Sequence, residues 1–108
     1  MDTRAITKPR EFTGNDQDWV PWQFTFRSYV GLLSSHIEEA MDIAEVHNEP
    51  FDMNAFSPEA AAMSRQLYHL LVTLCCKGRA ALVLMNCGRH NGYEAWRLLK
   101  HEFEPRLP

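Results

Sequence analysis

Apolar side chains recur at steps of three and four residues through most of the chain, and this spacing constrains the fold more than any other feature. Such spacing gathers apolar residues on one face of an α-helix, whereas a half-buried strand would alternate at every second residue. The first stripe consists of Trp19, Trp22, Phe26, Tyr29 and Leu33. Further stripes lie in residues 37–44, 63–74 and 95–103. We therefore expect an all-α domain, a compact bundle of four to five helices.

Capping signals mark where these helices begin. Asp18 as an N-cap places Pro21 in the first turn, where a proline is tolerated. Ser35 with Glu38 three residues later has the spacing of a capping box. Ser57, followed by a proline and an acid, is a strong start for the third helix.

The later boundaries depend on Gly78, Asn91 and Pro105. We expect Gly78 to end the third helix in a left-handed conformation, Asn91 to cap the last helix, and Pro105 to stop it. Residues 79–85 fit a buried helix or a strand equally well by periodicity. Because a single strand would have no partner, we expect a short buried helix there.

The sequence before residue 16 carries no helical stripe. A proline at position 9 biases Lys8 toward an extended conformation, and Phe12 is the one large apolar side chain able to anchor this segment. We expect an extended N-terminal arm over residues 1–15 and a single helical domain over residues 16–108, since 108 residues suffice for one domain and not for two.

The helical stripes must bury against one another in a single core. The residues that we expect to define this core are Phe12, Trp19, Trp22, Phe26, Leu67, Leu70, Leu74, Trp96, Leu99 and Phe103.

Charge is segregated along the chain. Residues 28–64 contain seven acids and neither lysine nor arginine, whereas residues 65–101 contain six lysines and arginines and one acid. These charges either solvate separate helix faces or attract one another, within the fold or between copies of the protein. The candidate assembly contacts are Glu38, Glu39, Asp42, Arg79 and Arg89.

No pattern in the sequence predicts catalysis, a metal or a cofactor. Cys75, Cys76, Cys87 and His90 lack the paired spacing of small zinc modules, and neither a phosphate loop nor a nucleophile elbow is present. An odd number of cysteines is a poor disulfide framework, which favours a reducing compartment, the cytosol or the nucleus. The longest apolar run, Ala80–Met85, is too short for a membrane span, and we expect no signal peptide.

The order of motifs resembles the Gag capsid region of LTR retrotransposons, closest to copia-type and related Gag polyproteins. The resemblance rests on Phe12-Thr13-Gly14, on Asp18-Trp19 and Trp22, and on a late Glu94-Ala95-Trp96-Arg97-Leu98-Leu99 helix that closes with Phe103-Glu104-Pro105. It implies an all-helical capsid N-terminal lobe that associates with copies of itself into a virus-like shell around the element's RNA. The shell would lie in the cytoplasm, and RNA would contact other parts of the parent protein.

Two departures from this family affect the prediction. The Cys-x2-Cys-x4-His-x4-Cys zinc knuckle is absent, and no room for a second capsid lobe follows Phe103. We therefore expect a fragment of a larger Gag, or a Gag-derived host protein reduced to one lobe.

Two other functions compete with shell formation. A host-adopted lobe could act as a monomeric peptide-binding adaptor, with Phe51 and Phe56 at the rim of a hydrophobic groove. Alternatively, the basic later half could bind nucleic acid weakly, although the net charge of −3 disfavours this.

Overall fold

The computed structural model describes residues 8–104, and these residues form five α-helices and no strand. The helices are α1 (Trp19–Leu33), α2 (Ser35–Glu45), α3 (Pro58–Leu74), α4 (Gly78–Met85) and α5 (Gly92–Phe103). The Cα radius of gyration is 13.3 Å, close to the value of about 13 Å for a folded domain of about 100 residues. The predicted all-α class is confirmed, as is a helix over residues 79–85. The prediction that this helix is buried is wrong for one face, because Leu82 and Met85 are exposed.

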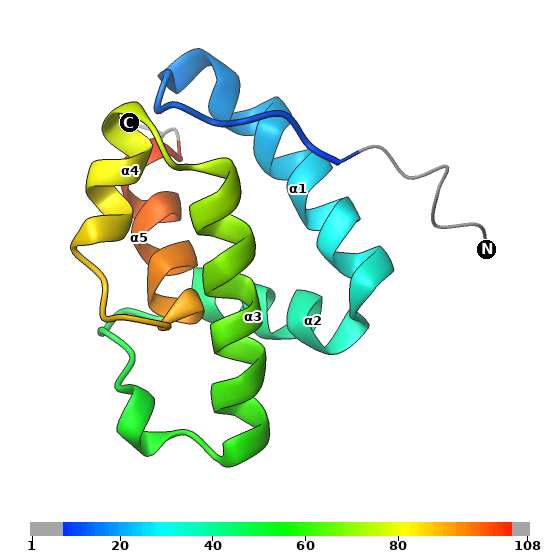
Figure 1. Cartoon of the computed structure of the whole chain (residues 1–108), viewed down its shortest axis with the longest axis vertical. Helices are drawn as coiled ribbons and strands as arrows, with labels where there is room; N and C mark the ends of the chain where they lie inside the picture. The colour runs from blue at the N-terminus through cyan, green and yellow to red at the C-terminus, as the bar shows by residue number, and fades with distance from the viewer. Residues whose placement is uncertain (1–7, 105–108) are drawn as a thin grey trace.

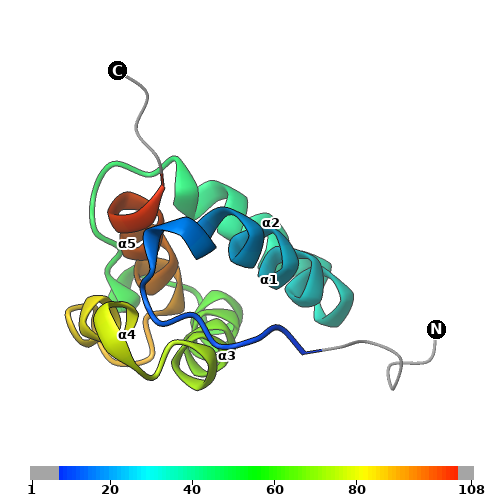
Figure 2. The same ribbon diagram turned by 90° about the horizontal axis from the view of Figure 1, so that it is seen from above.

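The last helix, α5, occupies the centre of the bundle (Figure 1). It packs against α2, α3 and α4, and every residue from Asn91 to Arg97 is buried. The α1–α2 hairpin lies on one side of α5, and α4 lies on the other side (Figures 1 and 2). The two flanking units therefore contact the same central helix and present their outer faces in different directions.

Aromatic rings from the arm, α1 and α5 form the middle of the core. The Trp19 ring lies 5.4 Å from that of Phe12 and 5.6 Å from that of Trp96. Trp22 stacks on Phe26 with 4.8 Å between ring centroids. Aromatic pairs at such separations stabilise beyond the area that they bury, so this cluster joins three segments that are distant in sequence.

Leucine side chains complete the core, with one correction to the expected set. Leu67, Leu74 and Leu99 are buried, as are all six predicted aromatic residues. Leu70 is only half-buried and packs at the border of the core. The inward row of α3 runs instead through Leu71, which is completely buried.

The stripe predicted for α1 is wrong at its end. Val30 is completely buried, whereas Tyr29 is half-buried and Leu33 is exposed. Steps that alternate between three and four residues have a period of 3.5, and over several turns they drift from the 3.6 period of a straight helix. The true inward row continues from Phe26 to Val30.

The N-caps are confirmed at three of four helices. The side chains of Ser57 and Asn91 accept hydrogen bonds from backbone amides of α3 and α5, and Asp18 is the N-cap residue of α1. The cap of α2 is Ser34, not Ser35, because Ser34 Oγ accepts the Ile37 amide at 3.3 Å. A single residue thus separates α1 from α2, and the predicted capping box does not form.

The described part of the arm, residues 8–15, contains no helix, and backbone carbonyl and amide groups of the arm bond to α1, to the end of α3 and to the start of α4. The Phe12 amide donates to the Leu74 carbonyl at 2.8 Å, and the Trp22 indole donates to the Arg10 carbonyl at 2.7 Å. The predicted arm residues 1–7 and the predicted stop at Pro105 lie outside the described residues.

Gly78 has the predicted positive φ, 65°, but it begins α4, because α3 already ends at Leu74. A Cβ atom on Gly78 would lie 2.3 Å from the Thr13 carbonyl oxygen. The glycine therefore serves the close crossing of the arm. Within residues 8–104, no helix is long and apolar enough to cross a membrane.

Candidate functional site

The outer face of the α1–α2 hairpin carries large apolar side chains in solvent. Phe24 on α1 is 75% exposed, and Ile43 and Val46, at the end of α2, are 63% and 78% exposed. They emerge here because the inward rows of both helices are already occupied by core residues such as Trp22 and Met41. We call Phe24, Ile43 and Val46 the hairpin patch.

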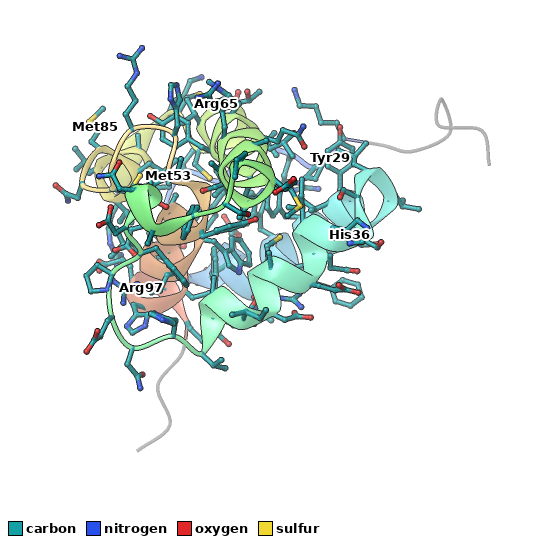
Figure 3. All side chains as sticks on the ribbon, turned by 90° about the horizontal axis from the view of Figure 1, so that it is seen from below. Tyr29, His36, Met53, Arg65, Met85 and Arg97 are labelled. Atoms are coloured by element: carbon teal, nitrogen blue, oxygen red, sulfur yellow. The ribbon has the colours of Figure 1, made fainter. Side chains whose placement is uncertain are left out.

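A second apolar surface lies on α4. Leu82 is 61% exposed and Met85 is 75% exposed, while Ala80 and Leu84 of the same helix face the core. We call Leu82 and Met85 the α4 patch. Figure 3 shows Met85 at the far end of the molecule from Tyr29 and His36, which belong to α1 and α2.

Charged side chains from the acidic middle and the basic later half meet inside the fold at Glu45. Its carboxylate pairs with Arg27, accepts the Trp96 indole N–H at 3.0 Å, and lies 3.9 Å from Lys100 Nζ. Burial lowers the pKa of Arg27, but hydrogen bonding and attraction from Asp42 and Glu45 outweigh this and raise it. Unlike charges therefore do attract one another within one copy.

Two of the five candidate assembly residues already have partners in their own chain. Asp42 pairs with Arg27. Arg79 pairs with Glu102 at 2.9 Å and with Asp16 at 3.2 Å, and its guanidinium lies 4.6 Å from the centroid of the Phe103 ring. A contact between copies through either residue would compete with these pairs.

The other three candidates, Glu38, Glu39 and Arg89, form no ion pair within residues 8–104. Glu39 and Arg89 are exposed, and Glu38 is half-buried. A Cβ atom on Gly31 would lie 2.7 Å from a Glu38 carboxylate oxygen, so Glu38 occupies the space that this glycine leaves open.

Phe51 and Phe56, which the adaptor hypothesis places at the rim of a hydrophobic groove, pack back onto α5, and Phe51 also lines a surface hollow of about 450 Å³. Both are half-buried, with ring centroids 6.2 Å and 5.4 Å from that of Tyr93. The Phe51 amide donates to Glu94 at 3.0 Å, and Asn91 Nδ2 donates to the Phe51 carbonyl at 2.9 Å. The loop between α2 and α3 is thus attached to the start of α5 by backbone and side-chain bonds.

Glu94 and Arg97 form a buried ion pair beneath this loop. Arg97 Nε and an Nη atom each donate to a Glu94 oxygen at 2.8 Å, in the bidentate geometry that gives the strongest such pairs. Burial alone would raise the pKa of Glu94, but the hydrogen bonds from Arg97 and the Phe51 amide lower it overall. The pair therefore stays charged and fixes the loop.

A cluster of cationic and aromatic side chains lies where α3 meets the α4–α5 loop. Arg65, Tyr68 and His69 project from α3, and Arg89 and His90 belong to the loop. The His90 ring centroid is 5.7 Å from that of Tyr68 and 5.4 Å from that of His69. We call these five residues the cationic cluster.

An apolar hollow of about 400 Å³ lies between α2 and α3 and explains the position of Leu70. Leu33, Ile37 and Leu70 line it, with His69 and Thr73 among its polar neighbours. A second hollow, of about 570 Å³, lies between the arm and α1 and is lined by Pro9, Trp22 and nearby residues.

The three cysteines form no disulfide. Burial raises the pKa of Cys75 to about 12 and that of Cys87 to about 11, so both are protonated thiols at neutral pH and weak nucleophiles. Within the described residues, no group of three or more His, Cys, Asp or Glu side chains could hold a metal ion.

Sequence reasoning missed the two apolar patches and the cationic cluster. Phe24 lies outside the apolar stripe predicted for α1, and this position was a sign that its side chain would be exposed. Arg65 and His69 are four residues apart and share a helix face. Their approach to His90 depends on tertiary structure and carries no local signal.

Comparisons with known proteins give no match: no family model, no curated protein and no solved structure is similar to this chain.

Proposed function

We propose that this chain is a structural domain of the Gag capsid type, whose role is to associate with copies of itself. The support is the order of Gag-like motifs from Phe12 to Pro105, together with a five-helix bundle whose buried charged groups serve structure. Under this proposal the domain is a capsid N-terminal lobe with an extended arm, and it has no catalytic role.

The observation that carries the proposal is the presence of two exposed apolar patches on opposite sides of one domain. Exposed apolar side chains that gather on one surface can mark a contact site. When the two contacting surfaces differ, the contact is heterologous, and repeating it produces rings or open chains. The hairpin patch and the α4 patch are separated by α3 and α5 (Figure 2), which suits a head-to-tail arrangement.

Charge would set the register of this contact. Glu38 and Glu39 lie on α2, the helix that carries part of the hairpin patch, and Arg89 follows α4. Each exposed pair contributes at most about 1 kcal/mol. Association of single domains would therefore be weak, and many repeated contacts would be needed for a stable shell.

The first test measures association of the 108-residue chain by sedimentation velocity over a range of concentrations. We expect the average mass to rise with concentration for the parent chain. Phe24→Ser and Met85→Ser should each abolish this rise. The control is Leu32→Ser, which changes an exposed α1 residue about 12 Å farther along the helix and should associate as the parent does.

A mixture of the two variants distinguishes a head-to-tail contact from a symmetric one. Each variant keeps one intact patch, so Phe24→Ser and Met85→Ser together can form one productive contact and should stop at a dimer. If Met85→Ser alone still dimerises, the contact is symmetric through the hairpin patch and the head-to-tail proposal is wrong. A parent chain that stays monomeric at every concentration would favour the adaptor hypothesis instead.

A further inference from the structure

Apart from Arg89, which would also help to set the register between copies, the residues of the cationic cluster have no part in the proposed self-association. We propose that it is a binding site for single-stranded nucleic acid, with Arg65 and Arg89 contacting phosphates and the rings of Tyr68, His69 and His90 contacting bases. The inference rests on other observations than the capsid proposal, because none of these residues belongs to either apolar patch.

The three rings lie close enough to act as one surface. Tyr68 and His90 are perpendicular with 5.7 Å between centroids, and His69 lies 5.4 Å from His90 at an interplanar angle of 52°. Tyr68 is also 5.5 Å from His69. Stacking of bases on such rings beside a cationic track is the general mode by which proteins bind single strands.

The loop that supplies His90 is held in place on α3. Gly92 begins α5 so close to α3 that a Cβ atom there would lie 2.2 Å from the Ser64 carbonyl oxygen and 2.5 Å from the Tyr68 amide nitrogen. Ser64 Oγ donates to the His90 carbonyl at 3.4 Å. The His90 backbone is left-handed, with φ of 64°. The cluster is therefore preorganised, which reduces the entropy lost on binding.

The charged groups that act on His90 are basic although the whole chain is acidic. Neither Arg65 nor Arg89 forms an ion pair within residues 8–104. Burial lowers the pKa of His90, and repulsion from Arg65, Arg89 and His69 lowers it further. No carboxylate contributes to this shift. An anion bound here would relieve the repulsion between His90 and the two arginines, neither of which forms an ion pair within the described residues.

The rings decide which kind of anion fits best. A phosphorylated or acidic peptide would use the two guanidinium groups and leave the rings unused. A single strand uses both, because phosphates alternate with flat bases along it. The expected ligand is therefore a short single-stranded RNA or DNA, bound without strong sequence preference.

The experiment titrates the chain into a fluorescent ten-nucleotide oligo-uridine and follows anisotropy at several salt concentrations, with poly-glutamate and inorganic phosphate as competitors. Removing both charges in Arg65→Gln/Arg89→Gln should weaken binding at least about tenfold and reduce the salt slope by about 1.4, the value for two phosphates of a single strand. The control Lys8→Gln/Arg10→Gln removes two exposed charges from the arm and should stay within about twofold of the parent.

Two further variants test the rings. Tyr68→Leu should weaken binding at least about fivefold. His90→Asn should also weaken binding, and the variant should fold because asparagine tolerates a left-handed backbone. It should also reduce the gain in affinity that the parent shows when the pH is lowered from about 7.5 to about 5.5. The charged and titratable groups around His90 are Arg65, Tyr68 and His69 on α3 and Arg89 on its own loop. Thermal melting of each variant identifies any that fail to fold.

Four results would overturn the proposal. The first is that the arm control weakens binding as much as Arg65→Gln/Arg89→Gln does. The second is that Tyr68→Leu and His90→Asn fold and bind the oligonucleotide as tightly as the parent. The third is that poly-glutamate competes as strongly as unlabelled RNA. A parent chain that does not bind the oligonucleotide at low salt would overturn it as well. None of these outcomes alters the sedimentation result expected for self-association.

Discussion

Replacing Trp96 by alanine should destabilise the domain more than any surface change. Trp96 is completely buried, and its ring lies 5.6 Å from that of Trp19 and 5.5 Å from that of Phe26. Its indole nitrogen donates to Glu45 at 3.0 Å. Truncation removes an aromatic side chain from the centre of the rigid core, where the surrounding rings cannot close the cavity.

The expected loss follows from these contacts. Trp→Ala in a core costs about 3–5 kcal/mol, against a total stability of about 5–15 kcal/mol for a folded domain. For a chain of this size, each kcal/mol shifts the melting temperature by about 4–8 °C. We therefore expect Trp96→Ala to melt at least about 12 °C below the parent, or to be largely unfolded at room temperature.

The measurement is urea unfolding followed by circular dichroism, with thermal melting as a second observable. Phe24→Ala is the matched control, because it removes an aromatic ring of which 75% is exposed, and its effect should stay within about 0.5 kcal/mol. Trp96→Phe keeps most of the packing and loses the hydrogen bond to Glu45, and it should lie between the two. If Trp96→Ala melts within a few degrees of Phe24→Ala, the placement of Trp96 at the centre of the core is wrong.

Two more predictions concern α5. Hydrogen bonds hold the pKa of Glu94 below its ordinary value of 4.5. The stabilisation from its charged form is therefore present above this value and is lost as the pH falls through the folded-state pKa. Glu94→Gln should flatten the acid side of a plot of stability against pH, and an unchanged profile would contradict the assignment. Gly92→Ala should destabilise the domain by about 1–3 kcal/mol through overpacking against the α3 backbone, which is more than the stabilisation that the higher helix propensity of alanine provides. The substitution should also weaken oligonucleotide binding, because it displaces His90. A Gly92→Ala protein more stable than the parent would show that the close approach is not rigid.

The fold could be predicted from sequence wherever a local signal was strong. The first three residues of the aromatic stripe, Trp19, Trp22 and Phe26, and the caps Ser57 and Asn91 each depend on neighbours within a few residues, so local rules place them correctly. The inward position predicted for Tyr29 and Leu33 was wrong because a period of 3.5 residues drifts from the helix period over four turns. The core position predicted for Leu70 was wrong because the angle between packed helices decides which border residues are covered. The N-cap predicted at Ser35 was wrong because α1 continues to within one residue of α2, and this one residue, Ser34, is the cap.

The candidate sites were harder to predict than the fold. Exposure of Phe24 depends on which helices cover α1, and periodicity identifies one buried face without showing whether the opposite face has a partner. Arg79 was a candidate for contacts between copies, but its partners, Asp16 and Glu102, are far away in sequence. His69 and His90 meet only because Gly92 brings α5 close to α3. Each of these features depends on tertiary contacts that no short stretch of sequence encodes.

The bond between the indole of Trp19 and the carboxylate of Glu104 has a consequence for synthesis on the ribosome. These residues are 85 positions apart, and α5, which supplies the centre of the bundle, is translated after every helix that packs on it. While α5 is still inside the exit tunnel, α1 and α3 have no central helix to bury their apolar rows. Closing so long a loop is slow compared with forming the helices themselves. The nascent chain therefore keeps Trp19, Trp22 and Leu67 exposed until α5 has left the tunnel, and it acquires its core in one late step.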